Sequence, residues 1–367
     1  MRIGIDAHHV GVQEGGNERY CENVIRCLAS APAQQDELFV FSYREAARRR
    51  IPNGRITHLP LNRRSVAWQR AVELPLHSWR LDLDVLHVPF NFLPVFRCRK
   101  VITIHDLTFL HLPQTHYPLE RLRMVVMTKL AARRADHILT VSEFIKQDIV
   151  DHYNLAPDLV TVAPNAADRD VFRPLDSVMR QAFRRAWRID YPYFLWVGIM
   201  QPRKNVATLV EAYVRLRATG HTDNHLVLVG RLGWMYEDVL RLIEDRGLAP
   251  VVHRFDEVDA AALAGFYSEA TALVVPSHWE SFGLPIIEAM SCGCPVVCSH
   301  AAAMPEIYGD AALAFDPAQP DELVDRLSRL LDDSALRDDL VVRGFKNADR
   351  FSWERTAAIV KGVYHRS

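Results

Sequence analysis

Residues 272–290 read ALVVPSHWESFGLPIIEAM, and this stretch contains one complete strand–loop–helix unit. The run Ala272–Val275 is wholly apolar, as expected for a strand whose two faces are covered by helices. Pro285 suits the first turn of a helix, where its missing N–H is harmless. Glu280 stands in the loop between them, and Glu288 stands one turn into the helix. The stretch therefore predicts an α/β unit with acidic groups beyond the carboxyl end of its strand.

Similar units recur along the chain, because short apolar runs alternate with helical patterns. The strand-like runs are Met1–Ile5, Leu38–Phe41, Val85–Val88, Val101–Ile104, His137–Val141, Tyr193–Val197, Leu226–Val229, Ala272–Val275 and Pro295–Cys298. This alternation predicts βα units and parallel sheets. The fold class is therefore α/β and doubly wound.

A break in the alternation falls between Asn165 and Tyr191, and each side of it has its own set of strands. We predict two Rossmann-like domains facing across a cleft, at residues 1–175 and 190–350. The last segment, residues 351–367, is expected to form a helix that can pack on either domain. In open α/β sheets, ligands bind beyond the carboxyl ends of the strands, so residues just after each strand are the candidates for a site.

The composition excludes several classes of protein. Lys and Arg number 44 and Asp and Glu 45, so the chain lacks the overall positive charge of a dedicated nucleic-acid binder. The six cysteines include no C-x-x-C pair, which disfavours a zinc site or a disulfide framework. A strand-like run begins at Met1 without an apolar signal segment, and no stretch reaches the ~20 apolar residues of a membrane span, which predicts a cytoplasmic protein.

Two candidate positions lie in the first domain. Gly15 and Gly16 follow the first strand and precede a helical pattern, so they allow a phosphate to approach a helix N-terminus, although a simple turn has the same composition. His105 and Asp106 follow the strand Val101–Ile104. The histidine could orient a sugar hydroxyl, with the aspartate fixing its tautomer, or it could be a structural residue at a strand end.

The second domain has two further candidates. Gly198 follows the strand Tyr193–Val197, and Arg203 and Lys204 stand at the start of the next helix, where they could clamp a diphosphate or be solvated. Glu280 and Glu288 could face one cavity and accept hydrogen bonds from vicinal hydroxyls, or they could lie on the surface. Together the strand ends suit a sugar nucleotide, with its hydroxyls at the carboxylates and its phosphates at the cations.

The segment from Glu280 to Glu288 resembles the E-x7-E motif of the retaining glycosyltransferases of family 4, which have two Rossmann-like domains in the GT-B arrangement. The resemblance covers nearly the whole chain, since the other matching segments occur in the same order. These are Gly15-Gly16, His105-Asp106, Val162–Asn165, Pro202–Asn205, Cys292–Val297, Met304–Glu306 and Phe351–Trp353. Two departures are Ile199, where many relatives have arginine, and the segment Phe255–Val258, where many have glycine in the base-binding loop.

The resemblance implies a role for each matching residue. Lys204 and Arg203 would hold the donor diphosphate, Glu288 the ribose and Glu280 the transferred sugar. It implies a catalytic set of His105, Asp106, Arg203, Lys204 and Glu280. It also implies a donor-binding set of Gly15, Gly16, Gly198, Arg203, Lys204, Val258, Ser281, Phe282, Gly283, Leu284 and Glu288.

The resemblance also implies the reaction. A hexose would pass, with retention, from a nucleotide-diphospho-sugar bound to the second domain to a saccharide or lipid-linked acceptor from the first. The sequence resembles bacterial polysaccharide mannosyltransferases, which makes GDP-mannose the first choice of donor and a UDP-sugar the second. The resemblance implies no resident cofactor. A sugar-nucleotide epimerase of the same fold and a non-catalytic nucleotide-sugar-binding subunit are the alternatives. Asp82-Leu83-Asp84 matches the D-x-D pattern of metal-dependent enzymes but precedes a strand, so we expect no metal.

A local excess of positive charge suggests a membrane partner. Between Arg44 and Arg134 there are 17 Lys or Arg residues and six Asp or Glu residues. Such a region could attract an anionic membrane surface or a lipid-diphosphate acceptor, and residues 65–70 and 122–126 could add an amphipathic face. Solvated helix surfaces account for the same count.

Overall fold

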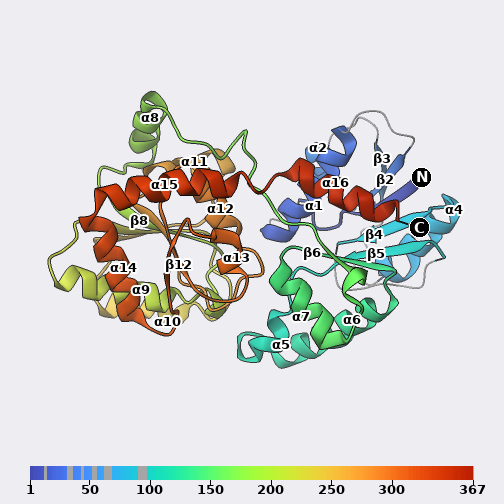
Figure 1. Ribbon diagram of the computed structural model, residues 1–367, viewed down its shortest axis with the longest axis horizontal. Coiled ribbons are helices and arrows are strands. Elements are labelled where there is room, and N and C mark those ends of the chain that lie inside the picture. Colours follow the sequence, from blue (N-terminus) through green and yellow to red (C-terminus); the bar gives the residue numbers. More distant parts are fainter. Residues whose placement is uncertain are drawn as a thin grey trace. The chain divides into compact units, whose positions relative to one another are not determined.

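The computed structural model describes residues 1–11, 15–30, 36–42, 45–51, 56–61, 68–89 and 97–366. The chain divides into two compact units, each with one parallel sheet (Figure 1). The first unit is Met1–Asn165 with Trp353–Ser367, and the second is Ala166–Ser352. The first unit therefore ends at Asn165 rather than near residue 175, and the segment between residues 175 and 190 belongs to the second unit.

The first unit contains a seven-stranded sheet of order β3-β2-β1-β4-β5-β6-β7. Its strands are β1 (Arg2–Asp6), β2 (Glu37–Ser42), β3 (Ile56–Pro60), β4 (Val85–Val88), β5 (Arg99–Thr103), β6 (His137–Thr140) and β7 (Val160–Val162). Its helices are α1 (Gly16–Ser30), α2 (Glu45–Arg50), α4 (Leu74–Arg80), α5 (Thr108–His111), α6 (Pro118–Arg134), α7 (Glu143–Tyr153) and α16 (Trp353–Tyr364). A π-helical turn, Gln69–Glu73, leads into α4, and short 3-10 turns occupy Pro113–Thr115 and Pro157–Leu159.

The second unit contains a six-stranded sheet of order β10-β9-β8-β11-β12-β13. Its strands are β8 (Tyr193–Val197), β9 (His225–Val229), β10 (Val252–Phe255), β11 (Ala272–Val275), β12 (Val296–Ser299) and β13 (Leu313–Phe315). Its helices are α8 (Ser177–Trp187), α9 (Val206–Ala218), α10 (Glu237–Asp245), α11 (Ala260–Glu269), α12 (Leu284–Ser291), α13 (Met304–Tyr308), α14 (Pro320–Asp332) and α15 (Ser334–Ala348). A 3-10 turn at Pro202–Lys204 precedes α9.

The predicted fold class is confirmed, because both sheets are parallel and doubly wound. In the second unit the chain moves outward from β8 to β10, then returns to pair β11 with the other edge of β8. In the first unit it moves outward from β1 to β3 and returns to pair β4 with β1. At such a reversal, right-handed crossovers send the two connecting helices to opposite faces, which opens a crevice at the carboxyl ends of the two strands. The loops after β8 and β11 border that position in the second unit.

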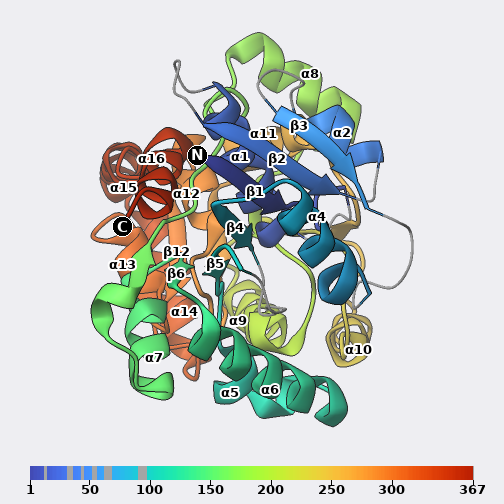
Figure 2. The same ribbon diagram turned by 90° about the vertical axis from the view of Figure 1, so that its right-hand side faces the viewer.

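The last helix, α16, packs on the first unit through buried and polar contacts, and it lies beside α1 in Figures 1 and 2. The fully buried Tyr364 places its hydroxyl 2.6 Å from Nδ1 of His87 on β4. Nε2 of the same imidazole lies 2.8 Å from Oγ1 of Thr103, and burial lowers the pKa of His87 to about 3. Thr356 donates a hydrogen bond to the carbonyl of Pro164, 2.5 Å away. A neutral histidine therefore links the last helix to the middle of the sheet.

Replacing Tyr364 with Phe should destabilise the first unit by about 1–3 kcal/mol, because it removes a partner from a buried imidazole nitrogen. The free energy of unfolding in urea measures this effect. Tyr153→Phe is the matched control, since the Tyr153 side chain is also buried but its hydroxyl has no hydrogen-bond partner among the described residues. Equal stabilities of the two variants would contradict the proposed link.

Candidate active site

The loops after β8 and β11 are bound to each other at the reversal of the second sheet. Asn205 ends the first loop in a left-handed conformation, with φ 53°, and its side-chain amide donates to the carbonyls of Pro276 and Pro317 at 3.0 and 3.1 Å. The backbone N–H of His278 donates to the carbonyl of Arg203 at 2.8 Å. These contacts fix the register of the two loops, so the side chains that they carry have defined positions.

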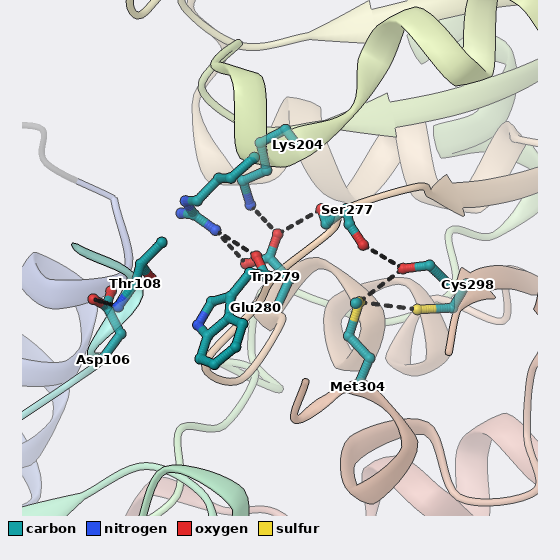
Figure 3. A network of polar contacts seen from close by, with 10 residues as sticks. Asp106, Thr108, Lys204, Ser277, Trp279, Glu280, Cys298 and Met304 are labelled. Atoms are coloured by element: carbon teal, nitrogen blue, oxygen red, sulfur yellow. Dashed lines mark hydrogen bonds and ion pairs between the residues drawn. The ribbon is translucent and has the colours of Figure 1, made fainter. Parts of the chain in front are cut away.

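The Glu280 carboxylate is the centre of a buried polar cluster (Figure 3). Its Oε1 accepts hydrogen bonds from Nζ of Lys204 at 2.5 Å and from the hydroxyl of Ser277 at 2.7 Å. Its Oε2 accepts from the Arg203 guanidinium at 3.0 Å, and the same nitrogen of Arg203 donates to the carbonyl of Trp279. The interpretation of Glu280 as a solvated loop residue is therefore wrong.

The cluster holds Glu280 in its ionised form. Burial alone would raise the pKa of this carboxyl, but the charges of Lys204 and Arg203, with the hydrogen bonds from Lys204 and Ser277, lower it to about 2. Burial, with a smaller contribution from Arg203, lowers the pKa of the Lys204 amine, and Glu280 opposes that shift. Two cationic side chains and one carboxylate thus share one water-poor position.

Glycines let the neighbouring loops approach each other closely. A Cβ atom on Gly230, which follows β9 and has φ +133°, would lie 1.8 Å from the carbonyl oxygen of Gly198. A Cβ atom on Gly233 would lie 2.6 Å from the carbonyl oxygen of Met200. A Cβ atom on Gly198 would lie 3.6 Å from Cε of Lys204, so the glycine borders the lysine stem. The loops after β8 and β9 therefore pack backbone to backbone beside the cluster.

The loop 281–284 turns the chain into α12. Gly283 has φ +87°, and its carbonyl accepts a hydrogen bond from the N–H of Ile286 at 2.9 Å. The Phe282 ring is buried and meets Phe351 edge-to-face at a centroid distance of 5.4 Å. Leu284 is buried, whereas Ser281 is partly exposed. If this loop binds a ligand, Phe282 and Leu284 therefore offer their backbone and not their buried side chains.

Glu288 occupies a separate buried position on α12. It is 2% exposed, so the interpretation as a surface residue is wrong here too. Its Oε2 accepts a hydrogen bond from the hydroxyl of Tyr267 on α11 at 3.0 Å. Val258 lies partly exposed in the loop between β10 and α11. The structure thus brings Glu280, Arg203 and Lys204 into direct contact and gives Glu288 a different partner.

The candidates of the first unit lie at the carboxyl ends of β1 and β5. Gly15 has φ +77° and lies directly before α1, which begins at Gly16. A Cβ atom on Gly15 would meet open space, so the left-handed backbone conformation, and not crowding, favours glycine at this position. His105 packs edge-to-face on Tyr20 at 5.0 Å, and burial lowers its pKa to about 3. Asp106 accepts a hydrogen bond from the N–H of Thr108 at 3.2 Å (Figure 3). The aspartate thus forms an Asx-type turn directly before α5.

Sequence reasoning missed three polar or close-packed positions. Ser277 donates to the Glu280 carboxylate three residues later within the same loop, a side-chain contact that the spacing alone does not predict. Gly230 follows an apolar strand directly, which is the usual signal for a close backbone approach. Asp6 ends β1, and both of its carboxylate oxygens lie 2.9 Å from Nδ1 of the buried His8.

No cluster of three or more His, Cys, Asp or Glu side chains within the described ranges could hold a metal ion. Of the D-x-D pattern, Asp84 precedes β4 and accepts a hydrogen bond from the N–H of Arg2 at 2.7 Å. That position is at the amino end of the strand, whereas ligands of such sheets bind at the carboxyl ends.

The Glu280 cluster predicts a pH-dependent stability. Since the pKa of the Glu280 carboxyl is about 2 in the folded chain and ordinarily 4.5, its stabilising effect is complete above about pH 5 and is lost as the pH falls towards about 2. Near pH 7, Glu280→Gln should lower the free energy of unfolding by about 3 kcal/mol, because two partly buried cations lose their counter-charge. Near pH 3 the difference from the native protein should shrink.

Urea titrations at both pH values measure this difference, with Glu244→Gln on the exposed side of α10 as the control. A difference between native protein and Glu280→Gln that does not change with pH would contradict the ionised cluster.

Two family models together match most of the chain. The model for glycosyl transferases group 1 matches residues 179–347, and the model for glycosyltransferase family 4 matches residues 14–171. Among characterised relatives, the O-antigen chain mannosyltransferase B of Escherichia coli is 35% identical over 76% of this chain and 74% of its own length. The MMP alpha-(1->4)-mannosyltransferase of Mycolicibacterium hassiacum is 32% identical over 66% of this chain and 57% of its own length.

Solved structures share the fold over the full chain. Sucrose-phosphate synthase of Thermosynechococcus elongatus has a TM-score of 0.78 at 20% identity and covers 99% of this chain and 98% of its own. HepE of Anabaena, solved with UDP-glucose, has a TM-score of 0.80 at 16% identity and covers 99% of both chains. The resemblance predicted from the sequence is confirmed, and the chain belongs to glycosyltransferase family 4, with the GT-B fold.

Proposed function

We propose that this glycosyltransferase moves a mannosyl residue, with retention, from GDP-mannose to a saccharide or lipid-linked saccharide in bacterial polysaccharide or glycolipid assembly. The observation that carries the proposal is the buried cluster of Arg203, Lys204 and Glu280 where the second sheet reverses. It combines a carboxylate for sugar hydroxyls with cations for a diphosphate. Mannosyltransferases among the relatives support the choice of sugar and favour transfer over epimerisation or simple binding.

The charges of the cluster suit a diphosphate. One carboxylate faces two cationic side chains, so a net positive charge is left at a position with little water. An arriving diphosphate would compensate that charge, and its oxygens would take over donors that now serve Glu280. The helices α9 and α12 begin just beyond the two loops, and their N-termini favour negative charge as well. Glu280 would then accept hydrogen bonds from the sugar.

The proposed reaction needs no resident metal and no dedicated protein base. The acceptor hydroxyl oxygen forms a bond to the anomeric carbon while the bond from that carbon to the diphosphate oxygen breaks. The hydroxyl proton passes to the departing diphosphate, and the nucleoside diphosphate leaves. Lys204 and Arg203 would stabilise the negative charge that grows on this leaving group, as preorganised charges do in many enzymes. Glu288 would accept a hydrogen bond from the ribose, with its carboxylate oriented by Tyr267.

The acceptor and the location belong to the same proposal. A lipid-linked acceptor would bring the enzyme to the cytoplasmic surface of an anionic membrane, and the excess of Lys and Arg between Arg44 and Arg134 supports such a contact. Part of that region, including residues 65–67, lies outside the described residues. Within the described part of the chain, no helix combines the length and apolarity of a bilayer crossing.

Ranking donors by thermal unfolding tests the proposal, because a ligand of the folded state raises the unfolding temperature according to its affinity. GDP-mannose should raise the unfolding temperature of the native protein more than UDP-sugars do. In Lys204→Ala, GDP-mannose should raise the unfolding temperature much less. Lys346→Ala, on the exposed side of α15, is the matched control and should keep the full rise. Transfer from the preferred donor should persist in excess chelator and give a product with the donor's anomeric configuration.

Three results would overturn parts of this proposal. If a UDP-sugar raises the unfolding temperature more than GDP-mannose does, the proposed donor is wrong. If the product has the inverted anomeric configuration, the proposed retaining mechanism is wrong. Conversion of the donor to an isomeric sugar nucleotide without an acceptor would show an epimerase.

A further inference from the structure

The helix α6 exposes an apolar stripe over its first three turns, from Leu119 to Leu130. Leu119, Leu122, Val126 and Leu130 follow one another at intervals of three and four residues, so they lie on one face of the helix. Leu119 is 80% exposed and Leu122 is 59% exposed, and the other two are more than 40% exposed. Isolated exposed leucines are normal on protein surfaces, but an aligned row is typical of an interaction site.

The opposite face of α6 is the one that packs on the unit. Thr128, Ala131 and Ala132 are buried there, and the Arg121 side chain donates a hydrogen bond to the carbonyl of Phe109 at 2.8 Å. Small buried residues let the helix lie close to its neighbours, and α6 contacts α5, α7 and β5 (Figure 2). The helix is therefore apolar on two faces, and the fold uses only one of them.

Cationic side chains flank the exposed stripe on both sides. At 3.6 residues per turn, Arg123 and Arg134 lie along one edge of it, and Lys129 and Arg133 lie along the other. All four are exposed, and none forms an ion pair with a described residue. Glu120 is the only acidic residue in the helix. An apolar row between two rows of cations is the pattern of a helix that lies in the surface of an anionic membrane.

We infer that the outward face of α6, defined by Leu119, Leu122, Arg123, Val126, Lys129 and Leu130, docks on an anionic lipid bilayer. The helix lies parallel to the bilayer, with its aliphatic side chains among the acyl chains and its cations at the phosphates. The stretch from Leu119 to Leu130 gives a contact about 18 Å long at a rise of about 1.5 Å per residue. This inference rests on the proposed contact with a membrane, and it assigns that contact to one surface of the first unit.

Sedimentation of the full chain with vesicles tests the inference. Vesicles of phosphatidylethanolamine and phosphatidylglycerol should carry the native protein down at low salt, and vesicles of phosphatidylcholine should not. Leu119→Ser with Leu122→Ser should weaken binding by about tenfold or more, and removal of Arg123 or Lys129 by about fivefold each. Val178→Ser with Met179→Ser in α8 is the matched control, since these side chains are also exposed and lie beside arginines.

Each outcome supports or overturns the assignment. Binding that the α6 variants lose and the α8 variant keeps supports it. Absence of vesicle binding, or equal binding of all variants, overturns it. If vesicle binding is absent and the α6 substitutions dissociate a dimer in solution, the stripe is instead a contact between two copies of the chain. Transfer to a water-soluble acceptor should be the same in native protein and α6 variants, so a failure of docking is distinguishable from a failure of the proposed reaction.

Discussion

The arrangement of the second unit depends on one buried carboxylate. An ionised Glu280 is costly in a water-poor position unless donors surround it, and Lys204, Arg203 and Ser277 are those donors. Two of them come from the loop after β8 and one from the loop after β11. The carboxylate therefore holds two loops together while it keeps two cations oriented. The same ion pairs that stabilise this unit hold the groups that the proposed reaction needs.

The topology explains why these distant residues meet. Arg203 and Glu280 are far apart in sequence, yet their loops leave neighbouring strands where the direction of the sheet reverses. Close backbone packing at Gly198 and Gly230 brings a third loop alongside. The functions proposed for the two units use different features of the same fold, since one uses strand ends and the other the outer face of α6.

The sequence predicts the fully covered strands of both sheets and predicts the edge strands less well. All nine strand-like runs are strands, and the four strands without a prediction, β3, β7, β10 and β13, are the four sheet edges. Edge strands are covered less fully, so their patterns are less apolar, as in the partly exposed β10. The sequence predicts Glu280, Glu288 and Lys204 as candidate site residues because they lie in the segments that follow strands. The direct pairing of Glu280 with Lys204 was not predictable, because spacing does not fix side-chain contacts.

The central claim is that cations hold the diphosphate and Glu280 holds the sugar. Calorimetric affinities for GDP and GDP-mannose, measured on native protein, Lys204→Ala and Glu280→Gln, test it most directly. Lys204→Ala should weaken both ligands by a similar factor, about tenfold or more. Glu280→Gln should weaken GDP-mannose relative to GDP, because only the former has the sugar. Equal weakening of both ligands by Glu280→Gln, or unchanged binding of GDP to Lys204→Ala, would contradict the account.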